Sequence, residues 1–122
     1  MYFNFIYLYI FLFIYLAPSI IRDVSITQKS SRYLKIKWKS PLKPNGVVTH
    51  YEITITGRVN RSLLIPTIVP MIELTTKIDD LTPYTPYTLT IRAGTHFGGK
   101  MMWGEYSEVI HFVTEKEGKL KI

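Results

Sequence analysis

The sequence predicts an all-β protein built as a seven-stranded β-sandwich. About seven short segments alternate apolar and polar residues, the period-2 pattern of strands that bury one face. Turn-forming residues separate these segments at intervals of roughly 8–12 residues, a spacing typical of sandwiches. No segment carries the apolar stripe of an amphipathic helix.

The first two strands show the alternation most clearly. Residues 24–27 alternate as Val-Ser-Ile-Thr and predict a short first strand. After a polar turn, residues 33–39 place Leu, Ile and Trp on one face and three lysines on the other. The turn cluster 41–46 follows and ends in Asn45-Gly46, a pair that tolerates positive φ.

The middle of the chain predicts three more strands. Residues 50–56 alternate again, with their aromatic and isoleucine side chains on one face. The segment 57–70 is less regular, and its prolines restrict it to an edge strand or loops, because proline cannot donate to a β-ladder. Residues 72–78 form the next predicted strand, which runs into Asp79-Asp80.

Two strands are predicted for the C-terminal part. Residues 87–93 alternate between apolar side chains and threonine or arginine. We expect residues 96–104 to form a glycine-rich loop, and residues 108–114 to form the last strand. Residues 115–122 read as a charged tail or linker.

Residues 1–17 differ in composition from the remainder. They consist mostly of Tyr, Phe, Ile and Leu, and the first charged side chain of the whole chain is that of Arg22. An apolar run ending near Ala17 fits a secretory signal peptide, although no basic residue precedes it. Counted to Ile21, the run approaches the roughly 20 residues of a membrane-spanning signal anchor. Translation of AT-rich non-coding DNA gives the same amino-acid composition, so an artefact of gene prediction is a third alternative.

Several landmarks stand in a fixed order along residues 18–114. They are Trp38 with Pro41, Asn45-Gly46 ahead of Tyr51-Glu52-Ile53, the run Leu81 to Tyr87, Ile91-Arg92-Ala93, Gly104 to Glu108, and Thr114. In this order and spacing they resemble the fibronectin type III domain, whose fold is an immunoglobulin-like sandwich. The chain contains no cysteine, which argues against a true immunoglobulin domain.

The resemblance assigns structural roles to five residues. It implies that Trp38 and Tyr51 fill the core between the sheets. It also implies that Leu81, Pro83 and Tyr87 form the family's tyrosine corner, in which the Tyr87 hydroxyl bonds to an upstream backbone group. These roles concern the fold and name no partner.

The residues that catalysis would need are not grouped in the sequence. His50, His96 and His111 fall on different predicted segments, and no nucleophile, phosphate-binding or metal-ligand motif occurs. The adjacent Asp79 and Asp80 would point to opposite faces of a strand, so we interpret them as turn residues and not as a calcium site. The sequence therefore predicts no enzymatic activity, no cofactor and no metal.

Two surfaces are candidates for recognition. Lys35, Lys37 and Lys39 share one strand face in a chain of net charge +6, which predicts either a solvated outer face or a site for heparan-type glycosaminoglycan. Nucleic acid is disfavoured, because no aromatic residue is interleaved with these lysines for base stacking. The second candidate is the loop 95–103, in which Phe97, Met101, Met102 and Trp103 either contact a partner or fold back over the end of the sandwich.

The segment Trp103 to Ser107 also resembles a degenerate Trp-Ser-x-Trp-Ser motif of cytokine receptors. In that motif aromatic rings stack with arginines of the neighbouring strand. Arg92 can supply one rung of such a ladder, whereas Thr90 stands where a second arginine would be expected.

The resemblance implies an extracellular or cell-surface, non-catalytic protein-binding or adhesion module of a longer receptor or adhesion protein. A passive spacer between neighbouring modules is the alternative, as is an ectodomain fragment of a receptor-type tyrosine phosphatase. Asn60-Arg61-Ser62 satisfies the N-glycosylation rule, so we expect a glycan on Asn60 if the chain enters the secretory pathway. Membrane contact is expected only through residues 1–17 or a segment of the parent protein.

Overall fold

The structure is a computed structural model that describes residues 6, 17–57, 67–70 and 74–118, the strand 67–70 by its backbone alone. The apolar run, apart from residue 6 and Ala17, lies outside the described residues, and so does the Asn60 sequon.

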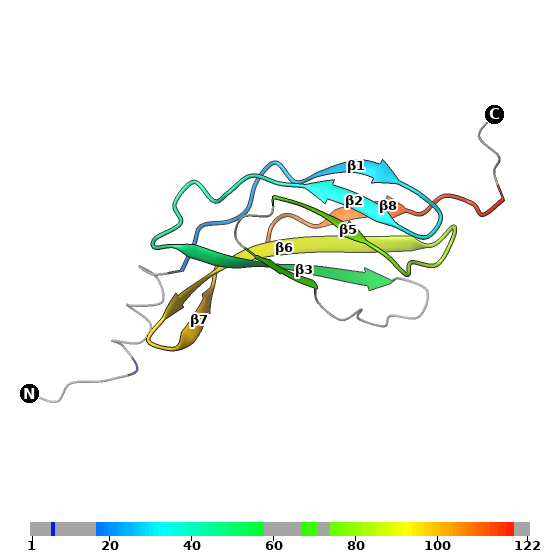
Figure 1. Cartoon of the computed structure of the whole chain (residues 1–122). Helices are drawn as coiled ribbons and strands as arrows, with labels where there is room; N and C mark the ends of the chain where they lie inside the picture. Colours follow the sequence, from blue (N-terminus) through cyan, green and yellow to red (C-terminus); the bar gives the residue numbers. More distant parts are fainter. Residues whose placement is uncertain (1–5, 7–16, 58–66, 71–73, 119–122) are drawn as a thin grey trace, which may run out of the picture.

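Two antiparallel sheets form the molecule (Figure 1). The smaller sheet contains β1 (Ser25–Lys29), β2 (Leu34–Lys37) and β5 (Thr75–Ile78), in the order β1-β2-β5. The larger sheet contains β4 (Thr67–Pro70), β3 (Val48–Gly57), β6 (Pro86–Phe97), β7 (Lys100–Trp103) and β8 (Ile110–Val113). Its order is β4-β3-β6-β7, and β8 pairs with β6. The predicted all-β sandwich is confirmed.

The edge of β6 carries one strand more than predicted, because β7 lies in the predicted loop 96–104, whereas β8 lies in the predicted last strand 108–114. β3 pairs with β6 along residues 87–95, so β7 and β8 must share the opposite edge of β6. They bind its two ends, β7 at 94–97 and β8 at 86–89. Together β7 and β8 therefore fill one strand position, which keeps the number of positions in the sandwich at seven.

The segment predicted as a glycine-rich loop is a β-hairpin instead. β6 continues to Phe97 and β7 begins at Lys100, so that only Gly98 and Gly99 lie in the turn. Both glycines have positive φ, 58° and 77°, as a two-residue hairpin turn requires. The two glycines thus convert what would be an irregular loop into an extension of the sheet.

The core lies between the two sheets. Trp38 and Tyr51 are buried there with their rings in an edge-to-face arrangement, 5.3 Å between centroids. Leu81 is buried too, and Tyr87 stacks on Phe112 at 5.5 Å. The Tyr87 hydroxyl accepts a hydrogen bond from the backbone N–H of Thr82 at 2.8 Å. Pro83 is only half-buried.

The edge strand β4 accommodates its proline as expected. It lies at the margin of the larger sheet, where Pro70 pairs with His50 at the strand end. Among the strands that the structure describes, none pairs with the outer side of β4, so a proline there interrupts no described ladder.

Candidate functional site

The outer face of the larger sheet carries a strip of polar and aromatic side chains near the β6–β7 hairpin. The strand register sets Arg92 opposite Glu52, Gly94 opposite both His50 and Trp103, and His96 opposite Met101. Side chains two residues apart on a strand share a face, so the members of this strip lie on one side of the sheet. The strip therefore combines residues from β3, β6 and β7.

Arg92 is the centre of the strip. Its guanidinium carbon lies 4.8 Å from the centroid of the Trp103 ring and 4.5 Å from that of Tyr106. Its Nε donates a hydrogen bond to Glu52 Oε1 at 2.9 Å, and the Arg92 and Glu52 side chains are only 22% and 12% exposed. The cation is thus stacked against two rings and neutralised by a carboxylate at the same time.

An interruption of the sheet edge brings both rings to Arg92. Between β7 and β8 the chain makes no regular strand pairing with β6. Ser107 there forms two hydrogen bonds to β6: its N–H donates to Ile91 O at 2.8 Å, and its Oγ accepts from Ile91 N–H at 3.0 Å. The side-chain bond compensates for a missing ladder bond. Trp103 before the interruption and Tyr106 within it can therefore face the same arginine.

The one-rung ladder suggested by the degenerate Trp-Ser-x-Trp-Ser resemblance is present in the structure. Trp103 and Tyr106 stack on Arg92. Thr90 offers no second cation, so this ladder contains a single arginine.

Gly94 makes room for the strip. A Cβ atom at this position would come within 2.7 Å of the Met101 sulfur and 2.8 Å of the Trp103 ring. Real Cβ atoms do not approach other heavy atoms so closely. The absence of a side chain thus lets Met101 and Trp103 lie across β6.

The four hairpin residues proposed for partner contact have different exposures. Phe97 stands at the tip and is 49% exposed, whereas Met101 and Trp103 are half-buried on the outer face. Met102 is only 3% exposed, because it occupies the inward position of β7. We therefore remove Met102 from the partner-binding surface.

A groove of about 660 Å³ borders the hairpin. Met101 and Trp103 line it from β7, and Pro18 and Asn45 line it from the segments on the other side. Phe97, Met101, Trp103 and this groove form what we call the hairpin surface.

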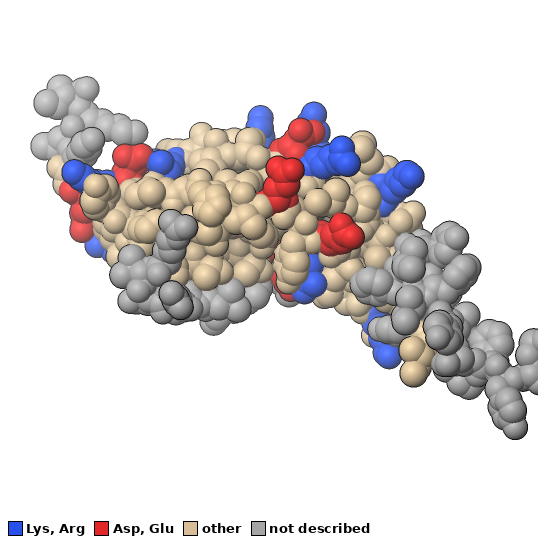
Figure 2. All heavy atoms as spheres, turned by 180° about the vertical axis from the view of Figure 1, so that it is seen from behind, with Lys and Arg blue, Asp and Glu red and all other residues tan. Residues whose placement is uncertain are grey.

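The lysine face lies on the outer side of the smaller sheet. Lys35, Lys37 and Lys39 are exposed, and the β2–β5 register adds Lys77 directly opposite Lys35. Lys39 approaches Asp23 at 3.7 Å, and Lys77 approaches Asp79 at 3.3 Å. Figure 2 shows basic and acidic side chains next to one another along the upper margin of the surface.

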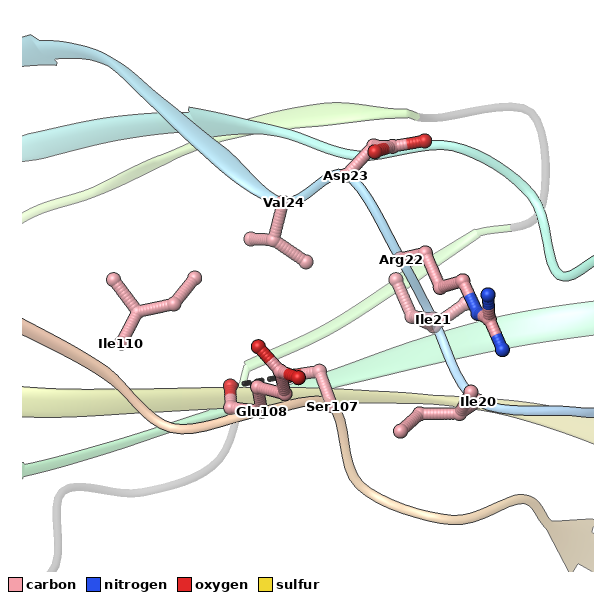
Figure 3. Close-up of a pocket in the computed structure, with 8 residues that line it drawn as sticks. All are labelled: Ile20, Ile21, Arg22, Asp23, Val24, Ser107, Glu108 and Ile110. Carbon is pink, nitrogen blue, oxygen red and sulfur yellow. Dashed lines mark hydrogen bonds between the residues drawn. The ribbon is translucent and has the colours of Figure 1, made fainter.

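A second groove, of about 480 Å³, runs along the open seam between the sheets (Figure 3). Its apolar walls include Ile21, which is buried, with Val24 and Ile110 packed against the core. The charged side chains of Arg22 and Glu108 stand at its margin. Its lining holds no arrangement of nucleophile, base and acid, and we interpret it as the edge of the core.

The described residues contain no cluster of three or more His, Asp or Glu side chains that could hold a metal ion. In that same part of the chain no helix is both long and apolar enough to span a membrane. What the strip and the hairpin surface offer chemically is recognition through aromatic, thioether and guanidinium groups.

The fold and the ladder define an all-β sandwich module of the kind found in receptors. The family profile of the fibronectin type III domain matches residues 17–110, and the chain belongs to that family. This module is a non-catalytic fold. The solution structure of the sixth fibronectin type III domain from human fibronectin type III domain containing protein 3 has a TM-score of 0.67 and 25% sequence identity. The match covers 87% of this chain and 93% of that domain.

Curated relatives are much longer proteins. The phosphatidylinositol phosphatase PTPRQ of Rattus norvegicus is 35% identical over 77 residues, which cover 63% of this chain and 3% of that protein. A protein of Drosophila melanogaster described as a cytokine receptor is 33% identical over 109 residues, which cover 80% of this chain and 8% of that protein. The chain thus spans less than a tenth of either relative.

Proposed function

We propose that the chain is an extracellular protein-binding or adhesion module of a longer cell-surface protein, and that its partner meets the hairpin surface. The observations that carry this proposal are the exposed Phe97 ring at the hairpin tip and, on the opposite face of the hairpin, the groove lined by Met101 and Trp103. Aromatic side chains lose little conformational entropy when they are buried in an interface, and methionine side chains adapt their shape to a partner. Both types are common anchors of protein interfaces. Trp103 is held in place by Arg92, so part of this surface is already ordered before binding.

A passive spacer is the competing function, and an ectodomain fragment of a receptor-type tyrosine phosphatase is a further alternative for the parent protein. A spacer contacts only neighbouring modules and needs no anchor residues at one end. The tyrosine-protein phosphatase Lar of Drosophila melanogaster supports the last alternative only through a module-sized match, which covers 4% of that protein. These alternatives predict different results for one pair of variants.

The experiment compares binding of the fluorescently labelled chain to a panel of cell lines. Phe97→Ser combined with Met101→Ser is expected to weaken binding roughly 30-fold or more, the effect of losing one anchor worth about 2 kcal/mol. Tyr84→Asn is the matched control: Tyr84 is an exposed aromatic residue in front of β6, at the opposite end from the hairpin. Its φ is 47°, which asparagine tolerates.

Each outcome discriminates between the functions. Binding that the hairpin variant loses and Tyr84→Asn retains supports the hairpin surface. Equal binding by wild type and hairpin variant contradicts it, and a failure of the wild-type chain to bind any cell favours the spacer. Thermal unfolding of each variant shows whether a loss reflects folding, because Met101 is half-buried and packs over Gly94, so that its replacement also affects stability.

A heparan-type glycosaminoglycan is a second candidate partner, and the pairing of Lys35 with Lys77 favours it. Like charges directly opposite each other destabilise a strand pair, and a polyanion would relieve that repulsion. Replacing Lys35, Lys37 and Lys39 by alanine is expected to lower the salt concentration that elutes the chain from heparin. A triple replacement of Lys43, Lys100 and Lys116 changes the net charge equally and is the control. If both triple variants elute from heparin at the same lowered salt concentration, only the net charge of the chain determines heparin binding.

A further inference from the structure

Three soft or borderline metal ligands meet at the base of the hairpin. The Nδ1 atoms of His96 and His50 lie 3.0 Å and 3.1 Å from the same oxygen, the Thr49 hydroxyl. The Met101 sulfur lies 3.9 Å from that oxygen. The two imidazole rings are 5.7 Å apart, centroid to centroid. Two nitrogens and one sulfur therefore lie within 3.9 Å of a single oxygen atom.

The strand register explains how residues so distant in sequence come together. His96 and Met101 are direct partners across β6 and β7. His50 faces Gly94, two positions from His96 and on the same face of the sheet. The β3–β6 ladder shifts register between Val48 and His50, so that Thr49 is the additional residue of a bulge. Bulges of this kind redirect a side chain, and here the hydroxyl lies between the two rings.

The Thr49 hydroxyl cannot satisfy all of its neighbours as a donor. It has one proton, and besides the two histidines it faces two acceptors, the Met101 sulfur and the Gly94 carbonyl oxygen at 3.4 Å. The two imidazoles and the thioether lie at a partly open surface, since His96 is exposed and His50 is half-buried.

The donor set selects for a particular class of ion. Thioether sulfur is a poor ligand for hard cations and a good one for copper(I), and imidazole also suits copper. Glu52, the carboxylate two positions from His50 on the same face of β3, is bonded to Arg92. We propose that His50, His96 and Met101 bind one copper(I) ion at the place that the Thr49 hydroxyl now occupies. Rotation of Thr49 about χ1 vacates that place.

The prediction of no metal site from the sequence depended on the separation of the histidines. The proposal replaces that prediction with a site of two histidines and one methionine. It does not depend on the proposed partner or on the ladder.

The test is a titration of the full chain with copper(I) alone under anaerobic conditions, in competition with a chromophoric copper(I) chelator. We expect one ion per chain, and chemical-shift changes of the His50 and His96 ring protons in the NMR spectrum. His96→Ala and Met101→Leu are each expected to weaken binding roughly tenfold or more, because even indirect changes at metal sites reach that size. Zinc favours thioether sulfur less than copper(I) does, so we expect zinc to bind more weakly and Met101→Leu to leave its binding unchanged.

His111→Ala is the matched control, because His111 is an exposed histidine on β8, which pairs with the other end of β6. It should bind copper(I) like the wild type. No binding, more than one ion per chain, or equal loss in the His96 and His111 variants would each overturn the proposal. The proposal would also be overturned if the Met101→Leu variant bound copper(I) as tightly as the wild type and had an unchanged unfolding curve.

Discussion

Replacing Arg92 with alanine is expected to lower the free energy of unfolding by about 3 kcal/mol, the lower end of the range for breaking a buried ion pair. The substitution leaves the Glu52 carboxylate, which is 12% exposed, without its cation. It also removes the guanidinium group that lies between Trp103 and Tyr106. Urea unfolding followed by far-UV circular dichroism measures the loss.

Two further variants test this interpretation. Arg92→Lys keeps the charge but replaces a planar group by a compact ammonium, which cannot stack on both rings, so an intermediate loss is expected. Arg22→Ala, at the exposed margin of the seam, should change stability by about 0.5 kcal/mol or less. A similarly small loss for Arg92→Ala would show that the ion pair and the ring contacts contribute no net stability.

The ladder also connects stability to the proposed function. Arg92 orders Trp103, and Trp103 lines the groove of the hairpin surface. A surface that is ordered before binding loses less conformational entropy when a partner arrives. Under the proposed function, Arg92 contributes to recognition by positioning Trp103, while its own side chain remains mostly buried.

The fold could be predicted from local patterns because most of its constraints are local. Strand alternation at 33–39 and 50–56 indicates which side chains enter the core, and burial of Ile36 and Ile53 agrees with it. The hairpin was missed although Gly98-Gly99 between two alternating segments is a recognised signal of a two-residue turn. With that signal, the alternation along β7 would also have identified Met102 as an inward residue.

The candidate sites depended on relations that a single sequence does not contain. Glu52 and Arg92 are 40 residues apart, and only the β3–β6 register makes them partners. The meeting of His50 with His96 follows from the same register, and the bulge at Thr49, which no local sequence pattern marks, adds a hydroxyl beside them. One-residue changes of register move side chains to the other face of a sheet, so such pairs follow from tertiary structure alone.

Replacing Gly104 with alanine is expected to destabilise the domain by about 2–3 kcal/mol, the cost of inserting a methyl group where no space exists. The new Cβ would overlap the carbonyl oxygen of Pro18. Neither backbone can easily withdraw. Gly104 N–H is bonded to Ala93 O at 2.8 Å, and the residues on either side of Pro18 are bonded to Lys43 and Asn45. A fall of roughly 10 °C in the melting temperature is the corresponding result for a domain of this size.

The comparison that isolates the overlap is Gly98→Ala. At Gly98 a Cβ meets no atom within 4 Å, and only the positive φ of 58° opposes a side chain, at a cost of about 1 kcal/mol. If Gly104→Ala unfolds at the same temperature as the wild type, the segment 17–19 must move aside at no cost. Its bonds to Lys43 and Asn45 would then contribute little, and this segment would lie on the sandwich without stabilising it. A loss larger than that of Gly98→Ala would instead mean that the segment is an integral edge of the domain and fixes the groove beside Trp103.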